Sequence, residues 1–366
     1  MKFKEYLLKD IATITMGQSP KSQFYNEDGK GIEFLQGVRT FGEDFPYFDT
    51  YTTKYNRLAY RNSILFSVRA PVGRVNWATK NIAIGRGVAS ISVKNMVYDR
   101  YVYYYFKKMG SFYDKKATGT VFTSINKKEL ESLKIKVPAS YDDQKRIADR
   151  LATLDRKIHL NQQLNANLFK LAKIHFDRQL DSENIKFSQI STIQNGYAFK
   201  SKEYVDTNEL MILRTKNIND NHLFSKNDVV YISKELFDEY KKFSFSAFDT
   251  VLVMVGASIG KTGFVTSNMT PSLQNQNMWR FRPKMSNIPG LLIFQYVNYI
   301  NKHVIGSATG SARSFYRKKL FSEFEVPRIN STNYIYFDTL QREIDHLNTE
   351  NEILYRIKHS LLNHYF

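Results

Sequence analysis

DDQKRIADRLATLDRKIHLNQQLNANLFKLAKIHFDRQL, residues 142–180, is the stretch of sequence that decides the fold. It contains no glycine and no proline, and residues suited to one seam recur at alternating spacings of four and three: Ile147, Leu151, Leu154, Ile158, Asn161, Asn165, Leu168 and Ala172. This spacing is typical of a coiled-coil helix. At about 1.5 Å per residue the helix would be about 58 Å long, which exceeds what one small domain needs. A partner for the seam is therefore expected.

The end of the chain supplies that partner. Residues 154–168, LDRKIHLNQQLNANL, match residues 340–354, LQREIDHLNTENEIL, without a gap. A second long helix, predicted over residues 332–366, has the corresponding seam, which consists of Leu340, Ile344, Leu347, Asn351, Leu354 and Leu361. Two like helices from one chain pack most simply as an antiparallel pair related by a pseudo-twofold axis. Alternatively, each helix packs separately on its own domain.

The segments that precede the two helices also repeat in the same order. Short apolar runs closed by turn residues predict β-strands in both copies. The matched blocks are 10–17 with 189–196, 33–38 with 211–216, 62–75 with 249–262, and 115–138 with 306–327. They place Gly73 on Gly260, Arg74 on Lys261, and Val137-Pro138 on Val326-Pro327.

The predicted fold is therefore α+β with an internal repeat. Two globular domains, at residues 1–141 and 181–331, are expected to be separated by two long antiparallel coiled-coil helices at 142–180 and 332–366. Asn165 and Asn351 occupy the same seam position, where a buried asparagine fixes helix register at a cost in stability. The alternative is that both asparagines face solvent or a partner subunit.

The net charge of +18 favours a polyanionic partner. Residues 1–180 carry 31 Lys and Arg against 17 Asp and Glu, whereas residues 181–366 carry 22 against 18. Nucleic acid is the favoured polyanion, because no basic amphipathic helix with an apolar lipid face is present. The alternative is a positively charged surface that only keeps the protein in solution.

Several function classes are excluded by composition. Cysteine is absent, which excludes disulfides and cysteine-based metal sites, and the seven histidines show no ligand spacing. No apolar run is long enough to cross a membrane, and the N-terminus lacks the apolar segment of a signal peptide. A soluble, cytoplasmic protein is expected.

No catalytic motif is recognisable. GASIGKT, residues 256–262, resembles a phosphate-binding P-loop but has one residue too few between its first glycine and Gly-Lys-Thr. No methyltransferase signature and no nuclease constellation is present. The chain is therefore predicted to lack catalysis and a metal site of its own.

The candidate binding residues lie at predicted strand ends and in polar loops. Arginine can bind guanine O6 and N7, asparagine and glutamine can bind adenine N6 and N7, and small hydroxyl residues can approach phosphates. The DNA-binding candidates are Lys21, Arg39, Arg69, Arg74, Arg86, Thr118 and Thr120 in the first copy, and Lys200, Arg214, Lys216, Lys261, Gln274, Asn275, Arg313 and Ser314 in the second. Each of them could instead be an ordinary surface residue.

These blocks resemble the specificity subunit of type I restriction–modification systems over nearly the whole chain. The resemblance rests on DIATITMG with its echo QISTIQNG, on ATG…KKEL…VP with its echo ATG…RKKL…VP, and on TLDRKIHLNQQLNANL. The second helix departs from the pattern in having Leu347 where the first has Asn161.

The resemblance implies two target-recognition domains, each reading one half of a bipartite, asymmetric site on double-stranded DNA. The helices would set the length of the unread spacer. Two methylation subunits, which carry S-adenosylmethionine and methylate adenine, and restriction subunits, which use ATP and Mg²⁺, would assemble around this chain. The alternatives are a stand-alone DNA-binding regulator, a specificity module of another methyltransferase system, and a self-sufficient nuclease or methyltransferase.

Overall fold

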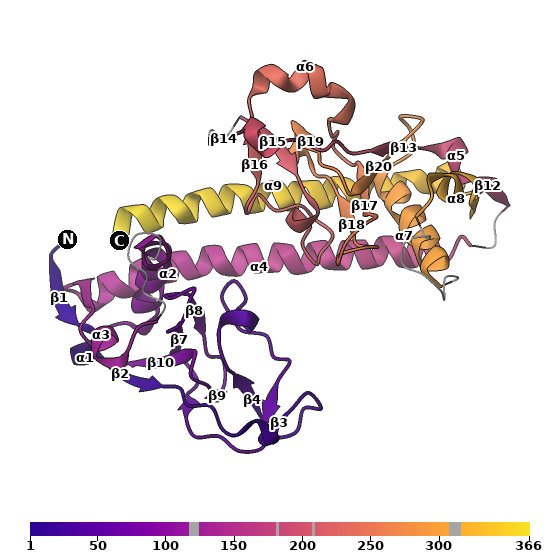
Figure 1. Ribbon diagram of the computed structural model, residues 1–366. Coiled ribbons are helices and arrows are strands. Elements are labelled where there is room, and N and C mark those ends of the chain that lie inside the picture. The colour runs from indigo at the N-terminus through magenta and orange to yellow at the C-terminus, as the bar shows by residue number, and fades with distance from the viewer. Residues whose placement is uncertain (117–123, 181–182, 207–208, 307–315) are drawn as a thin grey trace. The chain divides into compact units, whose positions relative to one another are not determined.

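The computed structural model describes residues 1–116, 124–180, 183–206, 209–306 and 316–366. The chain divides into two units, Met1–Arg156 with Arg356–Phe366 and Lys157–Tyr355. We call them the first and second unit. The two long helices are α4 (Tyr141–Asp177) and α9 (Tyr334–Tyr365), close to the predicted ranges, and each contributes one end to each unit (Figure 1).

The described residues of the first unit form three sheets. The strand pair β1 (Phe3–Leu7) and β11 (Lys134–Pro138) is antiparallel. An antiparallel four-stranded sheet has the order β2 (Ala12–Met16), β10 (Val88–Val93), β7 (Ile64–Ser67), β8 (Val75–Trp77). A five-stranded sheet has the order β3 (Tyr25–Asn26), β5 (Tyr51–Thr52), β4 (Ile32–Leu35), β9 (Ile82–Ile84), β6 (Leu58–Ala59), and its β4–β9 pair is parallel. Its short helices are α1 (Leu8–Ile11), α2 (Asp99–Lys116) and α3 (Lys127–Glu131).

The second unit has the corresponding sheets. The antiparallel pair is β12 (Asn184–Lys186) with β21 (Glu325–Pro327). The antiparallel four-stranded sheet has the order β13 (Ser191–Asn195), β20 (Met278–Pro283), β17 (Thr250–Val253), β18 (Thr262–Phe264). The mixed sheet has the order β14 (Tyr204–Val205), β16 (Val230–Ile232), β15 (Leu210–Leu213), β19 (Ser272–Gln274), and its β15–β19 pair is parallel. Its short helices are α5 (Phe187–Ile190), α6 (Phe237–Tyr240), α7 (Gly290–Gly306) and α8 (Lys318–Glu323).

Buried apolar faces hold each unit together. In the first unit the helix α2 buries Tyr103 and Phe106 against Trp77 and Phe66 of the four-stranded sheet. In the second unit α7 takes the same place and buries Leu291, Phe294 and Val297. The aromatic residues of α2 are therefore core residues, because a helix that covers a sheet gains most by removing apolar area from water.

The backbone confirms the predicted repeat and corrects its alignment. Gly73 and Gly260 both have positive φ, at 88° and 85°. In both units the next residue, Arg74 or Lys261, directly precedes the return strand: Ser67 N donates to Arg74 O, and Val253 N donates to Lys261 O. The turn from Val253 to Lys261 is one residue longer than the turn from Ser67 to Arg74, so the strand before it is shifted by one residue relative to the predicted match.

The match of the two Val-Pro pairs is wrong by two residues. Tyr6 lies opposite Ile135, and the equivalent Ile185 lies opposite Val326. Ile135, rather than Val137, therefore corresponds to Val326. The strand β11 simply continues two residues further before its proline than β21 does.

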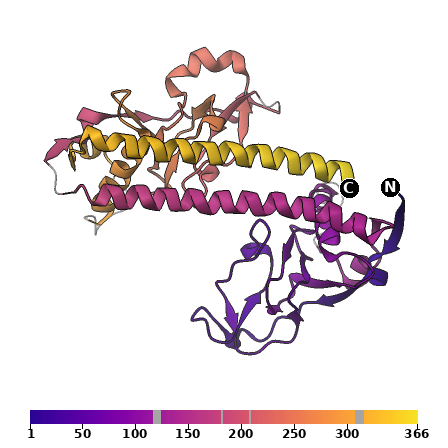
Figure 2. The same ribbon diagram turned by 180° about the vertical axis from the view of Figure 1, so that it is seen from behind.

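The helices pair antiparallel within each unit, and most of the residues predicted to form their seam are buried. In the first unit Arg150 Nη1 donates to Tyr365 OH at 3.1 Å, and Lys358 forms an ion pair with Asp155. In the second unit the two helices lie side by side (Figure 2), and Lys157 forms an ion pair with Glu350 at 3.0 Å. Buried seam residues are Ile147, Leu151, Ile158, Asn161, Asn165, Ala172, Leu340, Ile344, Leu347 and Asn351, whereas Leu154, Leu168, Leu354 and Leu361 are half-buried.

Two polar features of the seam refine the register hypothesis. Asn161 Nδ2 donates to Asn351 Oδ1 at 3.0 Å, so Asn351 pairs with Asn161 and not with Asn165. Asn165 is buried, and its Oδ1 has no hydrogen-bond partner among the described residues. Lys358, which was not among the predicted seam residues, is also buried between the helices of the first unit.

Candidate nucleic-acid interface

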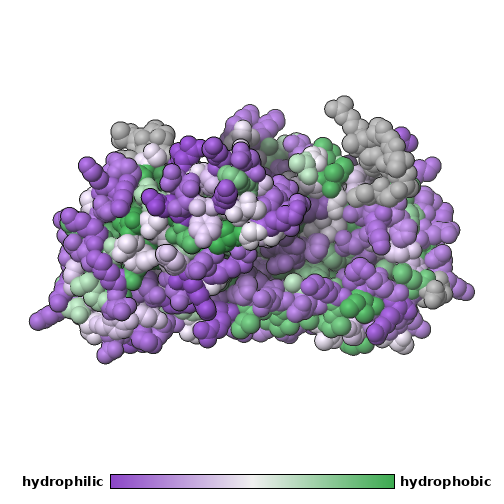
Figure 3. Space-filling model, turned by 90° about the horizontal axis from the view of Figure 1, so that it is seen from below, coloured by the Kyte–Doolittle hydropathy of each residue, from purple (hydrophilic) through white to green (hydrophobic). Residues whose placement is uncertain are grey.

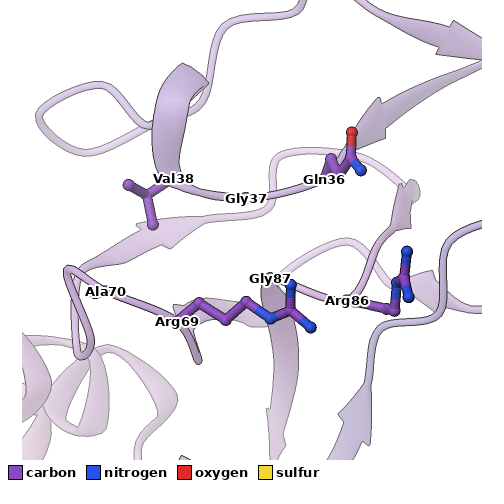
Figure 4. Close-up of a pocket in the computed structure, with 7 residues that line it drawn as sticks. All are labelled: Gln36, Gly37, Val38, Arg69, Ala70, Arg86 and Gly87. Carbon is purple, nitrogen blue, oxygen red and sulfur yellow. The ribbon is translucent and has the colours of Figure 1, made fainter. Parts of the chain in front are cut away.

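Three loops of the first unit meet at one small hollow. They follow β4, β7 and β9, and they contribute the segments Gln36–Val38, Arg69–Ala70 and Arg86–Gly87. The hollow has a volume of about 130 Å³. Figure 4 shows the two guanidinium groups below the segment Gln36–Val38 and the Gln36 amide above it.

Backbone hydrogen bonds fix these loops relative to one another. Gly85 N donates to Leu35 O at 2.8 Å, and Gly87 N donates to Gln36 O at 2.9 Å. A Cβ atom on Gly87 would lie 2.5 Å from Gln36 O, so a larger residue there would force the two loops apart. The glycines on either side of Arg86 thus hold it beside Gln36.

Two positively charged side chains line the hollow. Arg69 and Arg86 are exposed, and neither has an ion-pair partner among the residues that the structure describes. Pockets for small molecules usually have about 300–1,000 Å³, so this hollow is too small to enclose one. Exposed guanidinium groups at a shallow site suit the phosphates and base edges of a nucleic acid.

The remaining arginine candidates of the first unit differ in whether an acidic side chain binds their guanidinium group. Arg39 binds Asp49 through two hydrogen bonds, of 2.5 and 2.8 Å, so its guanidinium is occupied. Arg74 is exposed and has no side-chain partner in the described part of the chain. The structure therefore brings together Arg69 and Arg86, leaves Arg74 free beside the turn, and pairs Arg39 with an acid.

The basic candidates of the second unit lie close to acidic residues or backbone carbonyls. Arg214 is half-buried and donates through Nη2 to the carbonyl oxygen of Asp228, whose carboxylate lies 3.6 Å from Lys216. Lys261 donates to Asp220 at 3.1 Å, and the Asp220 side chain is fully exposed. Exposed pairs of this kind are weak, so Lys216 and Lys261 can exchange their acids for phosphate at little cost.

The prediction that Gln274 contacts DNA is wrong. Gln274 is completely buried, and its Nε2 donates to the backbone oxygens of Gln194 and Met278 at 3.2 and 2.8 Å. Asn275 is half-buried, whereas Gln276, which the prediction omitted, is exposed. The strand β19 is an end strand of the mixed sheet, and all three of its residues are buried, so side chains on both of its faces are covered.

The family model for the type I restriction modification DNA specificity domain matches residues 1–169 and again residues 179–356. The chain belongs to this family. The two matches cover most of both units, so the repeat found in the sequence is a repeat of the family domain.

Relatives in this family are named specificity subunits. The putative type I restriction enzyme MjaX specificity subunit of Methanocaldococcus jannaschii is 42% identical over 161 residues, which cover 44% of this chain and 38% of that protein. The MjaVIII specificity subunit of the same organism is 24% identical over 66% of this chain and 62% of that protein. The chain thus matches between about two fifths and three fifths of the length of these relatives.

The fold is that of a solved family member. The crystal structure of the type I restriction–modification S subunit from M. genitalium superposes with a TM-score of 0.60 at 17% identity, over 100% of this chain and 96% of that one. Two domains with two long helices are therefore the family fold.

The remaining predicted DNA-binding residues of the present chain lie as follows. Lys21 and Lys200 are exposed at equivalent places, each just before a short 3-10 turn, Ser22–Phe24 or Ser201–Glu203. Thr118, Thr120, Arg313 and Ser314 lie outside the described residues.

The described residues also bear on two further kinds of site, a metal site and a membrane span. Among those residues there is no group of three or more His, Asp or Glu placed to hold a metal ion, and no helix is long and apolar enough to span a membrane. On the face shown in Figure 3, hydrophilic residues predominate and hydrophobic residues form separate patches.

Proposed function

We propose that this chain is the DNA-recognition subunit of a type I restriction–modification complex. Each unit reads one half of a bipartite site on double-stranded DNA. Family membership supports this role, and so does the positive charge, which is concentrated in residues 1–180. The role of the two helices as a spacer ruler stays a prediction.

The observation that carries the proposal is that two arginines without an ion-pair partner among the described residues lie at one hollow of the first unit. Arg69 and Arg86 are held next to Gln36 by loops whose backbones are fixed to one another. Guanidinium and amide groups at the ends of strands are suited to base edges in the major groove. The corresponding loops recur in the second unit, as expected for a site with two halves.

Partner subunits are part of the same proposal. The helix α4 exposes a second apolar row, Leu160, Leu164, Leu171 and Ile174, of which between 43% and 53% of each residue is accessible. Spacings of four, seven and three residues keep the row on one helix face. We assign this row to docking of the methylation subunits. S-adenosylmethionine, ATP and Mg²⁺ then belong to the methylation and restriction subunits, and the chain itself contributes no catalytic group.

Selection from a library of random DNA duplexes tests the proposal. The full chain is used alone and after reconstitution with the methylation subunit of its own system, and the bound duplexes are sequenced. A bipartite motif is the expected result. The double variant Arg69→Ala/Arg86→Ala should lose sequence preference in one half of the motif and keep it in the other.

Arg61→Ala is the matched control, because Arg61 is an exposed arginine at the opposite end of β7 from Arg69. It should retain the complete motif. Absence of any enriched motif with either preparation would refute the proposal. Enrichment without a stable complex with the methylation subunit would favour the stand-alone regulator.

A further inference from the structure

The residues at the hollow of the first unit have counterparts in the second unit that are identified by matching backbone hydrogen bonds. Leu35 O accepts from Gly85 N at 2.8 Å, and Leu213 O accepts from Asn275 N at 3.2 Å. Gln36 and Arg214 directly follow these acceptors, so they occupy equivalent positions in the two units.

Two more positions are fixed by the same kind of bond. Val68 N donates to Gly87 O at 3.0 Å, and Met254 N donates to Asn277 O at 3.0 Å. Arg69 and Val255 follow the two donors directly, and are equivalent. Arg86 lies between Gly85 and Gly87, just as Gln276 lies between Asn275 and Asn277.

The two units therefore present different side chains from one backbone frame. Gln36 is replaced by Arg214, and Arg86 is replaced by Gln276, so the amide and the guanidinium have exchanged places. Arg69 is replaced by Val255, which is 55% exposed. Arg86 and Gln276 are both exposed, so each is free to contact a ligand.

This exchange has a direct chemical meaning for DNA. The guanidinium of arginine matches O6 and N7 of guanine, the amide of glutamine matches N6 and N7 of adenine, and an exposed apolar group can contact the methyl group of thymine. One guanidinium that becomes an amide at the same backbone place changes the preferred base pair at that place.

We propose that the position shared by Arg86 and Gln276 is a specificity switch: Arg86 selects a G·C pair in the half-site of the first unit, and Gln276 selects an A·T pair at the equivalent place in the half-site of the second. With two arginines at its hollow against one in the second unit, the first unit reads the half-site that is richer in G·C pairs. The inference rests on the proposed function, because it assigns bases to the sites through which each unit reads DNA.

The test is selection from the same random-duplex library with the full chain carrying Arg86→Gln or Gln276→Arg. Arg86→Gln should change one position of one half-site from G·C to A·T. Gln276→Arg should change one position of the other half-site from A·T to G·C. Each preferred pair should be favoured over the other by roughly 5- to 150-fold, the range expected for one bidentate base contact.

The outcomes separate this inference from the proposed function. If the unaltered chain enriches a bipartite motif but both variants enrich that same motif, the switch is refuted while the function stands. Uniformly weaker binding with an unchanged motif would mark phosphate contacts and would also refute the switch. If the unaltered chain enriches no motif, both fail. Arg61→Gln removes the same charge away from the hollow and should enrich the original motif, and thermal melting of each variant verifies that it is folded.

Discussion

The centres of the two four-stranded sheets differ sharply although their strands pair in the same register. In the first unit Ser90 Oγ donates to Ser63 Oγ at 2.9 Å, and both residues are buried. The equivalent residues in the second unit are Arg280 and Asp249. Arg280 Nε lies 3.9 Å from the carboxylate of Asp249. The same carboxylate accepts hydrogen bonds from Arg282 Nε and Nη2 at 2.8 and 2.6 Å.

The difference shows that the strand pairing of this fold does not depend on which side chains occupy these two buried positions. Strand pairing and apolar packing are kept in both units, whereas a neutral hydroxyl pair is exchanged for a buried ion cluster. The cluster also organises a loop, since Asp249 accepts from Ser246 N at 2.8 Å and Arg280 donates to Ser244 O. Burial lowers the pKa of Arg280 although Asp249 opposes this effect.

Removal of the carboxylate should produce the largest loss of stability. Asp249→Ala leaves two arginines without their shared acid, and the free energy of unfolding of the second unit should fall by about 3–5 kcal/mol. Ser63→Ala removes one neutral hydrogen bond and should cost the first unit about 1 kcal/mol. Urea unfolding of the full chain measures both.

The two tryptophans allow each unit to be followed separately. Trp77 lies in the core of the first unit and Trp279 in that of the second. Trp77→Phe therefore leaves a reporter of the second unit, and Trp279→Phe leaves a reporter of the first. Equal losses for Asp249→Ala and Ser63→Ala would contradict the comparison.

The helix seam gives a second, smaller contrast. Asn161→Leu leaves Asn351 without its partner across the helices and should lower the stability of the second unit by about 1–3 kcal/mol. Asn165→Leu replaces a buried amide whose oxygen has no partner in the described structure, and should leave stability unchanged or raise it. A loss from Asn165→Leu as large as that from Asn161→Leu would show that both asparagines fix the register.

The smallest expected effect is a difference in pH dependence. Asp44 O accepts from Trp77 N, and at the equivalent place His222 O accepts from Phe264 N, at 2.8 and 2.7 Å. Burial tends to raise the pKa of Asp44, but Lys107 and Lys358 outweigh it, so that pKa lies below 3.8. Burial lowers the pKa of His222 below 6.5.

Both groups bind protons more weakly when folded, so both units lose stability on acidification, but in different ranges. The contribution of His222 is complete above pH 6.5 and is lost as the pH falls towards its lowered pKa. The contribution of Asp44 is retained until the pH falls below 3.8. Unfolding of single-tryptophan variants across pH 3–8 should show the second unit weakening first. His222→Asn, which tolerates the left-handed backbone there (φ 63°), should abolish the early loss.

The long helices could be predicted because apolar spacing reports which face of a helix is covered. Apolar spacing could not identify Lys358 as a seam residue, because a charged residue interrupts the apolar pattern. Its burial depends on Asp155, which also accepts from Tyr104 OH at 2.6 Å. No local pattern could show that these three residues meet.

The binding loops were predicted less well because strand periodicity does not reveal a strand covered on both faces. Gln274 corresponds to Ile84, since each backbone oxygen accepts from an equivalent nitrogen, Gln18 N to Ile84 O and Tyr197 N to Gln274 O. Ile84 is buried. An alignment of residues 82–93 with residues 272–283 would have matched Gln274 with the buried Ile84. It would also have matched Gln276 with Arg86.

The division of the helices between the units has a consequence for how the protein is made. The first unit includes Arg356–Phe366, and the ring of Phe366 lies 4.9 Å from that of Tyr101 in its core. Synthesis proceeds from the N-terminus, so every residue of the second unit leaves the ribosome before the first unit receives its last segment. The first unit therefore starts to be synthesised before the second unit but is completed after it. A chain truncated at residue 355 would leave the first unit without residues 356–366.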